Sequence, residues 1–217
     1  MEMTMSAAAT ADKGYASFWD KTAASYAKRP VSDEAAYQAK LAKIREVLSP
    51  TSEVLEFGCG TGSTALALAP HAGSILASDV SGKMLEIAEE KRRAAGAENV
   101  SFAKVAFSDQ ETAEEAYDVV LGMSILHLMP NWREMIAKAH GALKPGGRLI
   151  TSTVCLSGAW RLLRPVVWLA RQFGKAPALA FLSERELRAE MERRGFVIEH
   201  RAGQKSPAVF LIARKLG

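Results

Sequence analysis

The chain has 217 residues, a length that fits one α/β domain better than two. Hydrophobic residues make up 48% of the sequence and charged residues 24%, which excludes wholesale disorder and allows a buried core of ordinary size. The formal net charge of +4 is smaller than the clustered basic charge of a dedicated nucleic-acid-binding protein, so a nucleic-acid partner is not expected.

Cysteine content and hydropathy give expectations about the cellular compartment. Cys59 and Cys155 are too few for a disulfide framework and fit a reducing compartment, so we expect a cytoplasmic protein. The sequence has no run of 18 apolar residues, and we expect no transmembrane helix. Residues 1–14 lack the features of a secretory signal and are predicted to be a mobile leader before a single domain over residues 15–217.

Two helices are predicted at the start of this domain, over residues 16–28 and 33–48, and together residues 15–48 would form a lid. Ser32 or Asp33 would cap the second helix. Strands then alternate with helices. The strands are predicted at residues 54–57, 74–80, 100–106, 117–125 and 148–154, and the helices between them at residues 63–68, 83–95 and 131–143. Such alternation predicts a mostly parallel sheet with helices on both faces.

The C-terminal part is predicted to end the sheet differently. Ser183 and Glu186 form the capping box of a helix that ends at Gly195. Strands predicted at residues 196–200 and 208–214 follow with no helix between them. The fold class is therefore α/β, a seven-stranded mostly parallel sheet with one antiparallel edge strand.

The strongest chemical signal is the loop after the first strand, residues 56–62, which reads Glu-Phe-Gly-Cys-Gly-Thr-Gly. A glycine-rich loop between a strand and its helix can cradle a nucleotide-like ligand, because the backbone can approach the ligand closely. The dinucleotide pattern Gly-x-Gly-x-x-Gly is not met, since its sixth position is Ser63. The Glu56 carboxylate would repel two phosphates and suits a ligand with positive charge.

This loop closely resembles the first motif of the class I S-adenosylmethionine-dependent methyltransferases. Asp79 at the end of the second strand, residues 117–120 (Tyr-Asp-Val-Val) and residues 143–147 (Leu-Lys-Pro-Gly-Gly) resemble later motifs in the same order. The resemblance covers roughly residues 19–215. It implies a Rossmann-like fold, S-adenosylmethionine as cofactor with S-adenosylhomocysteine as product, and methyl transfer by in-line displacement to a small acceptor.

The resemblance also implies the cofactor-binding residues. Asp79 would accept hydrogen bonds from the two ribose hydroxyls, and Glu56 would face the positive end of the cofactor. Cys59 reads as a small loop-filling residue, and Met84 is equally well explained as core. The remaining implied contacts are Gly58, Cys59, Gly60, Gly62, Val80, Met84, Gly122, Met123 and Tyr26. Where the family usually has an acid at the adenine, this chain has Ala106, so the backbone of Ala106 and Phe107, or Asp109 after a shift of the loop, would make that contact.

Catalysis of methyl transfer depends mainly on alignment of the acceptor with the methyl group and on exclusion of water from the site. His127 follows the fourth strand, and its ordinary pKa suits a general base near neutral pH, although a packing role explains it as well. Tyr15, Tyr26 and Tyr37 are the alternatives. No group of residues has the spacing of metal ligands, and no metal is expected.

Residues 156–182 form an insertion after the fifth strand and are predicted to be a substrate lid. On a helix over residues 159–175 the residues Arg161, Arg164, Trp168, Arg171 and Lys175 would line one stripe, and most other positions are apolar. This pattern is typical of a helix at a membrane surface. The alternative, which we favour, is a cap over the sheet with its basic stripe in water. Both imply an apolar or amphiphilic acceptor.

These features predict a small-molecule methyltransferase. The alternatives are a membrane-surface binding module that uses residues 159–175, an RNA methyltransferase, which the dispersed charge disfavours, and an NAD-dependent oxidoreductase, which Ser63 and Glu56 disfavour.

Overall fold

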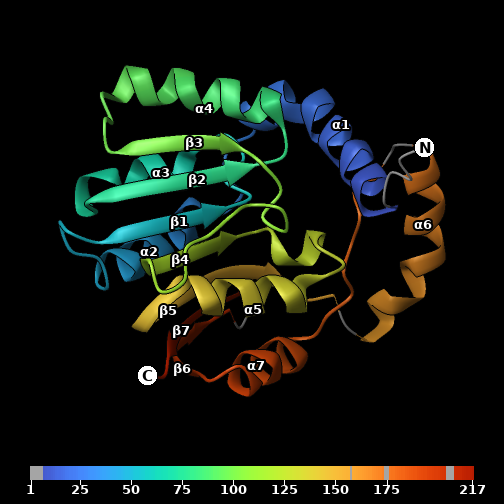
Figure 1. Cartoon of the computed structure of the whole chain (residues 1–217). Helices are drawn as coiled ribbons and strands as arrows, with labels where there is room; N and C mark the ends of the chain where they lie inside the picture. The colour runs from blue at the N-terminus through green and yellow to red at the C-terminus, as the bar shows by residue number, and fades with distance from the viewer. Residues whose placement is uncertain (1–6, 157, 174–175, 204–207) are drawn as a thin grey trace, which may run out of the picture.

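The computed structural model describes residues 7–156, 158–173, 176–203 and 208–217. Seven strands form one sheet in the order β3-β2-β1-β4-β5-β7-β6, with helices on both faces (Figure 1). The strands are β1 (Glu53–Phe57), β2 (Ser74–Asp79), β3 (Val100–Lys104), β4 (Tyr117–Met123), β5 (Leu143–Val154), β6 (Phe196–Ala202) and β7 (Ala208–Lys215). The α-helices are α1 (Ala7–Ala27), α2 (Glu34–Arg45), α3 (Ser63–Leu68), α4 (Gly82–Ala95), α5 (Trp132–Ala142), α6 (Arg164–Gln172) and α7 (Glu184–Arg193). The short 3-10 helices are η1 (Ala69–His71), η2 (Leu126–Leu128) and η3 (Gly158–Leu163).

The sheet is mixed, as predicted. Strands β3, β2, β1, β4 and β5 run parallel to one another, whereas β7 runs antiparallel to both β5 and β6. The antiparallel strand lies one position inside the edge, because β6 pairs with its outer side. Residues 204–207 between β6 and β7 lie outside the described residues.

The side chains along each strand alternate between two cores, because successive side chains of a strand point to opposite faces of the sheet. Leu55 and Val120 pack with α5 and α7 on one face. Val54 and Val119, one residue before them in β1 and β4, pack with α2 and α3 on the other face. Burial on both faces explains why these strands read as continuous apolar runs in the sequence.

Helices α2, α4 and α7 begin at residues whose side chains cap the first turn. The Asp33 side chain accepts a hydrogen bond from the backbone of Ala36, and Ser81 caps α4 in the same way. Ser183 and Glu186 form the complete capping box of α7. These side chains satisfy N–H groups that the first helical turn leaves without partners.

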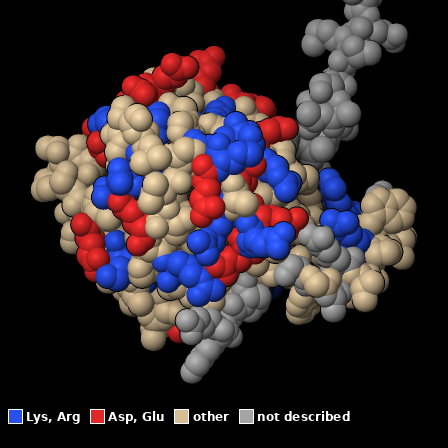
Figure 2. All heavy atoms as spheres, turned by 90° about the horizontal axis from the view of Figure 1, so that it is seen from below, with Lys and Arg blue, Asp and Glu red and all other residues tan. Residues whose placement is uncertain are grey.

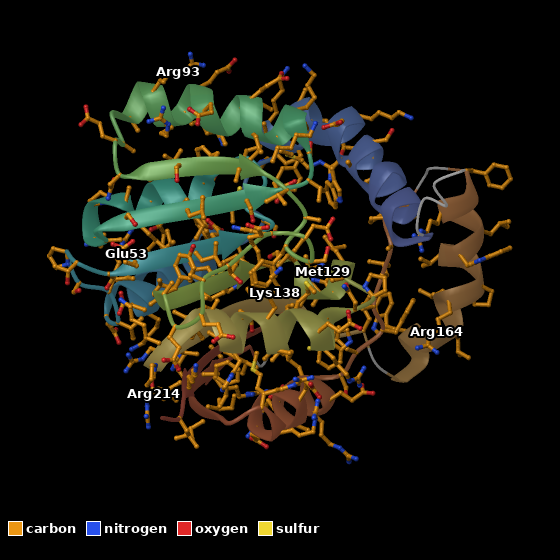
Figure 3. All side chains as sticks on the ribbon, viewed as in Figure 1. Glu53, Arg93, Met129, Lys138, Arg164 and Arg214 are labelled. Atoms are coloured by element: carbon orange, nitrogen blue, oxygen red, sulfur yellow. The ribbon has the colours of Figure 1, made fainter. Side chains whose placement is uncertain are left out.

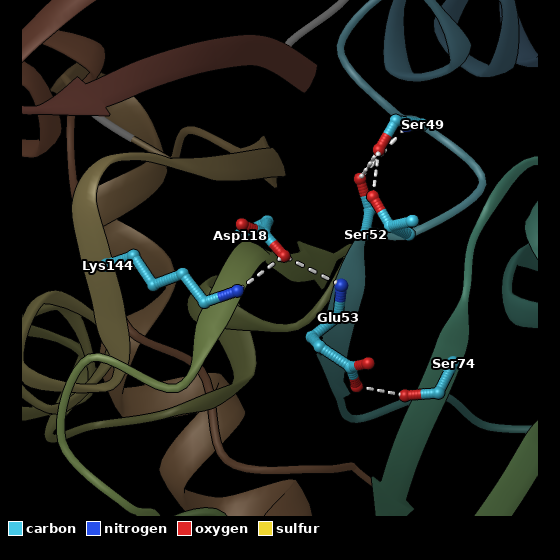
Figure 4. Close-up of polar contacts among 7 residues, drawn as sticks. Ser49, Ser52, Glu53, Ser74, Asp118 and Lys144 are labelled. Atoms are coloured by element: carbon cyan, nitrogen blue, oxygen red, sulfur yellow. Dashed lines mark hydrogen bonds and ion pairs between the residues drawn. The ribbon is translucent and has the colours of Figure 1, made fainter.

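The amino ends of β1, β4 and β5 are held together by one side chain (Figure 4). The Oδ2 atom of Asp118 accepts hydrogen bonds from the backbone N–H of Glu53 at 2.8 Å and from Nζ of Lys144 at 2.9 Å. Ser74 of β2 donates to the Glu53 carboxylate from the other side. Asp118 and Lys144 belong to the two later motifs noted in the sequence, and their role here is to fix the end of the sheet away from the glycine loop.

Two predicted boundaries differ from the structure. Helix α1 begins at Ala7, so the helix includes residues that the sequence assigned to a mobile leader. Strand β5 begins at Leu143, which pairs with Tyr117 of β4, so the strand includes residues 144–147, which the sequence placed before it. The pairing with β4 resumes at Val119 and Arg148 after a shift in register.

Helix α6 does not cover the sheet, so the prediction of a cap was wrong. It lies at the side of the molecule (Figure 1). The apolar side chains of Val166 and Leu169 in α6, and of Phe173 directly after it, are 63%, 53% and 70% exposed. Pro165 is in the first turn of α6, where a missing N–H is tolerated, so the proline stands at the start of this helix. Of the predicted stripe, Lys175 and the side chain of Arg161 lie outside the described residues. In the part of the chain that the structure describes, no helix is long and apolar enough to cross a bilayer.

Candidate functional site

A cavity of about 540 Å³ lies at the carboxyl ends of the parallel strands. The sheet order reverses between β1 and β4, and open α/β sheets bind ligands at such a point. The loops after β1, β2 and β4, the end of β5 and the connection from α1 to α2 line the cavity. Met129 is one of these lining residues, and Figure 3 shows it at the end of the sheet opposite Glu53.

The glycine loop presents bare backbone to this cavity. Gly58 and Gly60 both have positive φ angles, +67° and +55°, which favour glycine. A Cβ on Gly58 would lie 2.4 Å from the side chain of Ile125, whereas a Cβ on Gly60 would meet only the Tyr26 ring at 4.0 Å. Gly58 is therefore needed for packing, and Gly60 leaves room for a ligand to approach the backbone.

Gly62 and Gly122 do not line the cavity, although the sequence placed both at the cofactor. Gly62 precedes α3, and a Cβ there would lie 2.7 Å from the ring of Phe102. A Cβ on Gly122 would lie 2.5 Å from the ring of Phe57. Both glycines therefore make close packing of an aromatic ring possible.

Asp79 ends β2 with its carboxylate fixed at the glycine loop. Its Oδ2 accepts a hydrogen bond from the N–H of Gly60, and its Oδ1 accepts one from the N–H of Ser81, each at 2.9 Å. Burial raises the pKa of Asp79, and these backbone hydrogen bonds oppose the rise. Each oxygen keeps a lone pair, so the carboxylate can accept two further hydrogen bonds from a pair of hydroxyls.

Glu56 lines the same cavity and is 2% exposed. Among the described residues, no hydrogen-bond donor reaches its Oε2. Burial raises the pKa of Glu56 to about 8, and the charge of Asp79 contributes to the rise. The neighbouring Cys59 also lines the cavity, and burial keeps the pKa of its thiol well above the ordinary value. Cys59 is therefore a small filling residue and not a nucleophile.

The side of the cavity beyond Asp79 is apolar. Val80, Met84 and Phe107 line it, and their contact with the cofactor stays a prediction. Ala106 does not, and its carbonyl already accepts hydrogen bonds from the backbone of Asp109 and Gln110. The Asp109 side chain is exposed and does not line the cavity either. Of the residues expected at the adenine, Phe107 therefore lines the cavity and Ala106 and Asp109 do not, and the adenine contact itself stays a prediction.

Helix α1 covers the glycine loop, and α2 supplies further lining residues. Trp19 and Tyr26 of α1 line the cavity with their rings 6.2 Å apart. Asp20, which follows Trp19 in the sequence, accepts hydrogen bonds from the Ser81 hydroxyl at 2.6 Å and from the N–H of Lys83 at 3.1 Å. This contact ties α1 to the first turn of α4. Of the other tyrosines, Tyr37 lines the cavity, and the side chain of Tyr15 lies outside the described residues.

His127 does not line the cavity, which removes the geometric basis for the predicted general base. Its backbone carbonyl accepts a hydrogen bond from Ala180, and in the part of the chain that the structure describes its Nδ1 has no partner. Burial lowers the pKa of His127 to about 4. The neutral ring is a packing residue of η2, the alternative that the sequence left open.

Several cavity residues carry no motif that the sequence could reveal. Lys40 of α2 and Ser152 of β5 line the cavity and are hydrogen-bonded to each other at 3.0 Å. Lys91 of α4 donates to the hydroxyls of Thr61 and Ser63, at 3.0 and 3.2 Å. The helical spacing of Tyr37 and Lys40 was the one available signal for Lys40.

No described residue of the 158–182 segment lines the cavity, so a lid role for it is not seen. Among the described residues, no group of three or more His, Cys, Asp or Glu side chains could hold a metal ion.

Comparison with known proteins agrees with this geometry. The family model of a methyltransferase domain matches residues 26–201. Methyltransferase GfsG of Streptomyces halstedii is 29% identical over 113 residues, which are 51% of this chain and 41% of GfsG. The highly reducing polyketide synthase lcsB of Purpureocillium lilacinum is 29% identical over 138 residues, which are 58% of this chain. The chain spans only 5% of that synthase and less than half of GfsG.

A solved structure has the same fold over nearly the whole chain. It is geranyl diphosphate C-methyltransferase from Streptomyces coelicolor, in complex with Mg2+, geranyl diphosphate and S-adenosyl-L-homocysteine. The TM-score is 0.72 at 13% identity, and the match covers 95% of this chain and 98% of that one. At this identity the likeness shows the fold.

Proposed function

Because the chain belongs to the class I S-adenosylmethionine-dependent methyltransferases, we propose that it transfers the methyl group of that cofactor to a small apolar or amphiphilic acceptor. The observation that carries this proposal is Asp79. Its carboxylate is fixed by two backbone N–H groups beside an open glycine loop, at the point where the sheet order reverses.

The cavity residues fit the parts of this cofactor. Asp79 would hold the two ribose hydroxyls, and Val80, Met84 and Phe107 would pack around the adenine. Glu56 would face the positively charged amino-acid end, because its Oε2 is buried and lacks a donor among the described residues. The bound cofactor supplies a methyl group already activated by a positively charged sulfur.

The acceptor side of the cavity is apolar. Val31, Met123, Ile125 and Met129 line it, together with Leu128. Such walls exclude water and orient an apolar acceptor, which is what an in-line displacement requires from the protein. Burial raises the pKa of Tyr26 and of Tyr37, so both hydroxyls stay protonated at neutral pH. The chain's contribution is therefore binding, alignment and dehydration of the reactants.

Isothermal titration calorimetry tests the cofactor. We expect S-adenosylhomocysteine to bind and NAD not to bind. Asp79→Ala removes the acceptor of two hydroxyl hydrogen bonds, so the affinity for S-adenosylhomocysteine should fall at least ~10-fold. The matched control is Asp109→Ala, which removes an exposed carboxylate outside the cavity and should leave the affinity unchanged. Binding of NAD, or unchanged affinity in Asp79→Ala, contradicts the proposal.

We also propose that α6 makes a peripheral contact with an anionic membrane. Val166, Leu169 and Phe173 share one face of α6 and are more than half exposed. Arg164 and Arg171 lie on the same short helix, and residues 156–182 contain no Asp or Glu. Figure 2 shows a largely uncharged lobe at the side of the molecule where Figure 1 places α6. Basic and exposed apolar side chains together complement an anionic lipid surface.

Vesicle co-sedimentation tests this contact. The protein should sediment with phosphatidylglycerol vesicles at low salt, less so at high salt, and poorly with phosphatidylcholine vesicles. Leu169→Glu should reduce binding at least ~10-fold, because it places a like charge against the lipid. Val197→Glu changes an exposed apolar residue of β6 and should have no effect. Equal sedimentation of both variants and the wild type contradicts the contact.

A further inference from the structure

Three basic side chains line the cavity in addition to the groups already assigned to the cofactor. Arg29 is exposed at its mouth. Lys91 donates to the hydroxyls of Thr61 and Ser63 at the start of α3. Lys40 extends from α2 to the end of β5, where its Nζ lies 3.0 Å from Oγ of Ser152.

The ammonium group of Lys40 is half-buried, and among the described residues it forms no ion pair. In the part of the chain that the structure describes, its one hydrogen bond goes to Ser152, a residue that is itself 2% exposed. Burial lowers the pKa of Lys40, and the charge of Asp33 opposes this only in part. An ammonium has three donors, so two remain for a ligand. A partly buried cation without a counter-charge is costly, which favours an anion beside it.

The position of this pair separates it from the nucleoside side of the cavity. Ser152 lies in register with Met123 of the neighbouring strand β4, and its carbonyl accepts a hydrogen bond from Ser124 at 2.7 Å. Asp79 ends β2, on the other side of β1. An anion held by Lys40 would therefore lie beyond the glycine loop, toward the apolar walls formed by Met123 and Met129.

We propose that Lys40 and Ser152 form a subsite that binds a carboxylate inside the cavity. The subsite deepens the proposed function and rests on it. The carboxylate has two possible sources, the amphiphilic acceptor or the amino-acid end of the cofactor. Both would present a planar anion to the ammonium group and to the Ser152 hydroxyl, a charge-assisted hydrogen-bond pair.

Calorimetry with Lys40→Met distinguishes the two sources. The variant keeps the length of the side chain and removes its charge. The ligands titrated are S-adenosylhomocysteine and methylthioadenosine, which lacks the amino-acid end. Octanoate represents an acceptor with a carboxylate, and octanol is its neutral analogue. Octanoate and octanol are titrated with and without saturating S-adenosylhomocysteine. Lys43→Met is the control, because Lys43 is an exposed residue of the same helix that pairs with Glu46.

The subsite is supported in either of two ways. If the acceptor supplies the carboxylate, Lys40→Met loses octanoate affinity at least ~10-fold and keeps its affinity for octanol and S-adenosylhomocysteine. If the cofactor supplies it, the variant loses affinity for S-adenosylhomocysteine but not for methylthioadenosine. Unchanged affinity for both anions overturns the subsite while leaving wild-type S-adenosylhomocysteine binding, and with it the proposed function, intact. Circular dichroism verifies that the variant is folded.

Discussion

Glu56 and Asp79 stand at the ends of neighbouring strands, but their surroundings give them different protonation behaviour. Asp79 receives backbone hydrogen bonds on both oxygens, which stabilise its charged form. Burial of Glu56 raises its pKa to about 8. At neutral pH the Glu56 side chain is therefore mostly protonated, and binding of a cationic group beside it releases a proton.

This difference predicts how cofactor binding depends on pH. The affinity for S-adenosylhomocysteine should rise from about pH 6 to about pH 8 and then level off, because below pH 8 the Glu56 proton must leave first. The cost is about 1.4 kcal/mol for each pH unit below the pKa, an upper limit of tenfold per unit. Calorimetry in two buffers of different ionisation enthalpy measures the released proton directly.

The control for this prediction is Glu56→Gln, which should bind the cofactor product more weakly and without the pH dependence below pH 8. The folded protein binds the Glu56 proton more tightly than the unfolded chain does, so the protonation contribution to stability is lost as pH rises from 4.5 toward 8. The variant should therefore be more stable than the wild type to thermal unfolding at pH 9. Unchanged pH dependence of binding in Glu56→Gln contradicts the assigned role.

At the scale of the element, local residues were sufficient to predict most helices and strands. Ser183 and Glu186 start α7, and Gly96 ends α4 in the left-handed conformation, as their types indicate. The amphipathic pattern of α6 was also recognised, but periodicity does not say what covers an apolar face. That face is exposed because α6 lies at the side of the molecule and away from the sheet, a placement that depends on the whole chain.

The contact between α1 and α4 predicts a further effect of a single side chain. Asp20→Ala removes the acceptor for the Ser81 hydroxyl and for the N–H of Lys83. Loss of a capping interaction costs about 1 kcal/mol of stability. Because Trp19 and Tyr26 cover the cavity from the same helix, S-adenosylhomocysteine should also dissociate faster. Stopped-flow fluorescence and thermal unfolding measure the two effects.

Ser183→Ala is the matched control for this experiment, because it removes the cap of α7, which does not line the cavity. It should lower stability by a similar amount and leave the dissociation rate unchanged. Equal dissociation rates for Asp20→Ala and the wild type would show that α1 does not hold the ligand.

At the scale of the whole molecule, the predictable part of the site is the part that is local in sequence. Gly58, Gly60 and Asp79 stand in recognisable places after two strands, and the structure brings them together. Lys40 and Ser152 are 112 residues apart, and neither has an unusual neighbour in the sequence. Their contact follows from the packing of α2 against the sheet. The sequence placed His127 at the cavity because it follows β4, but this position does not fix the direction of the side chain, and His127 does not line the cavity.

The most direct test is a crystal structure of the protein soaked with S-adenosylhomocysteine. We expect both ribose hydroxyls to lie within hydrogen-bond distance of the Asp79 carboxylate, with the adenine against Phe107 and the backbone of Gly60 in contact with the ligand. A ligand bound elsewhere, or an Asp79 side chain turned away from it, would rule out the proposed cofactor site.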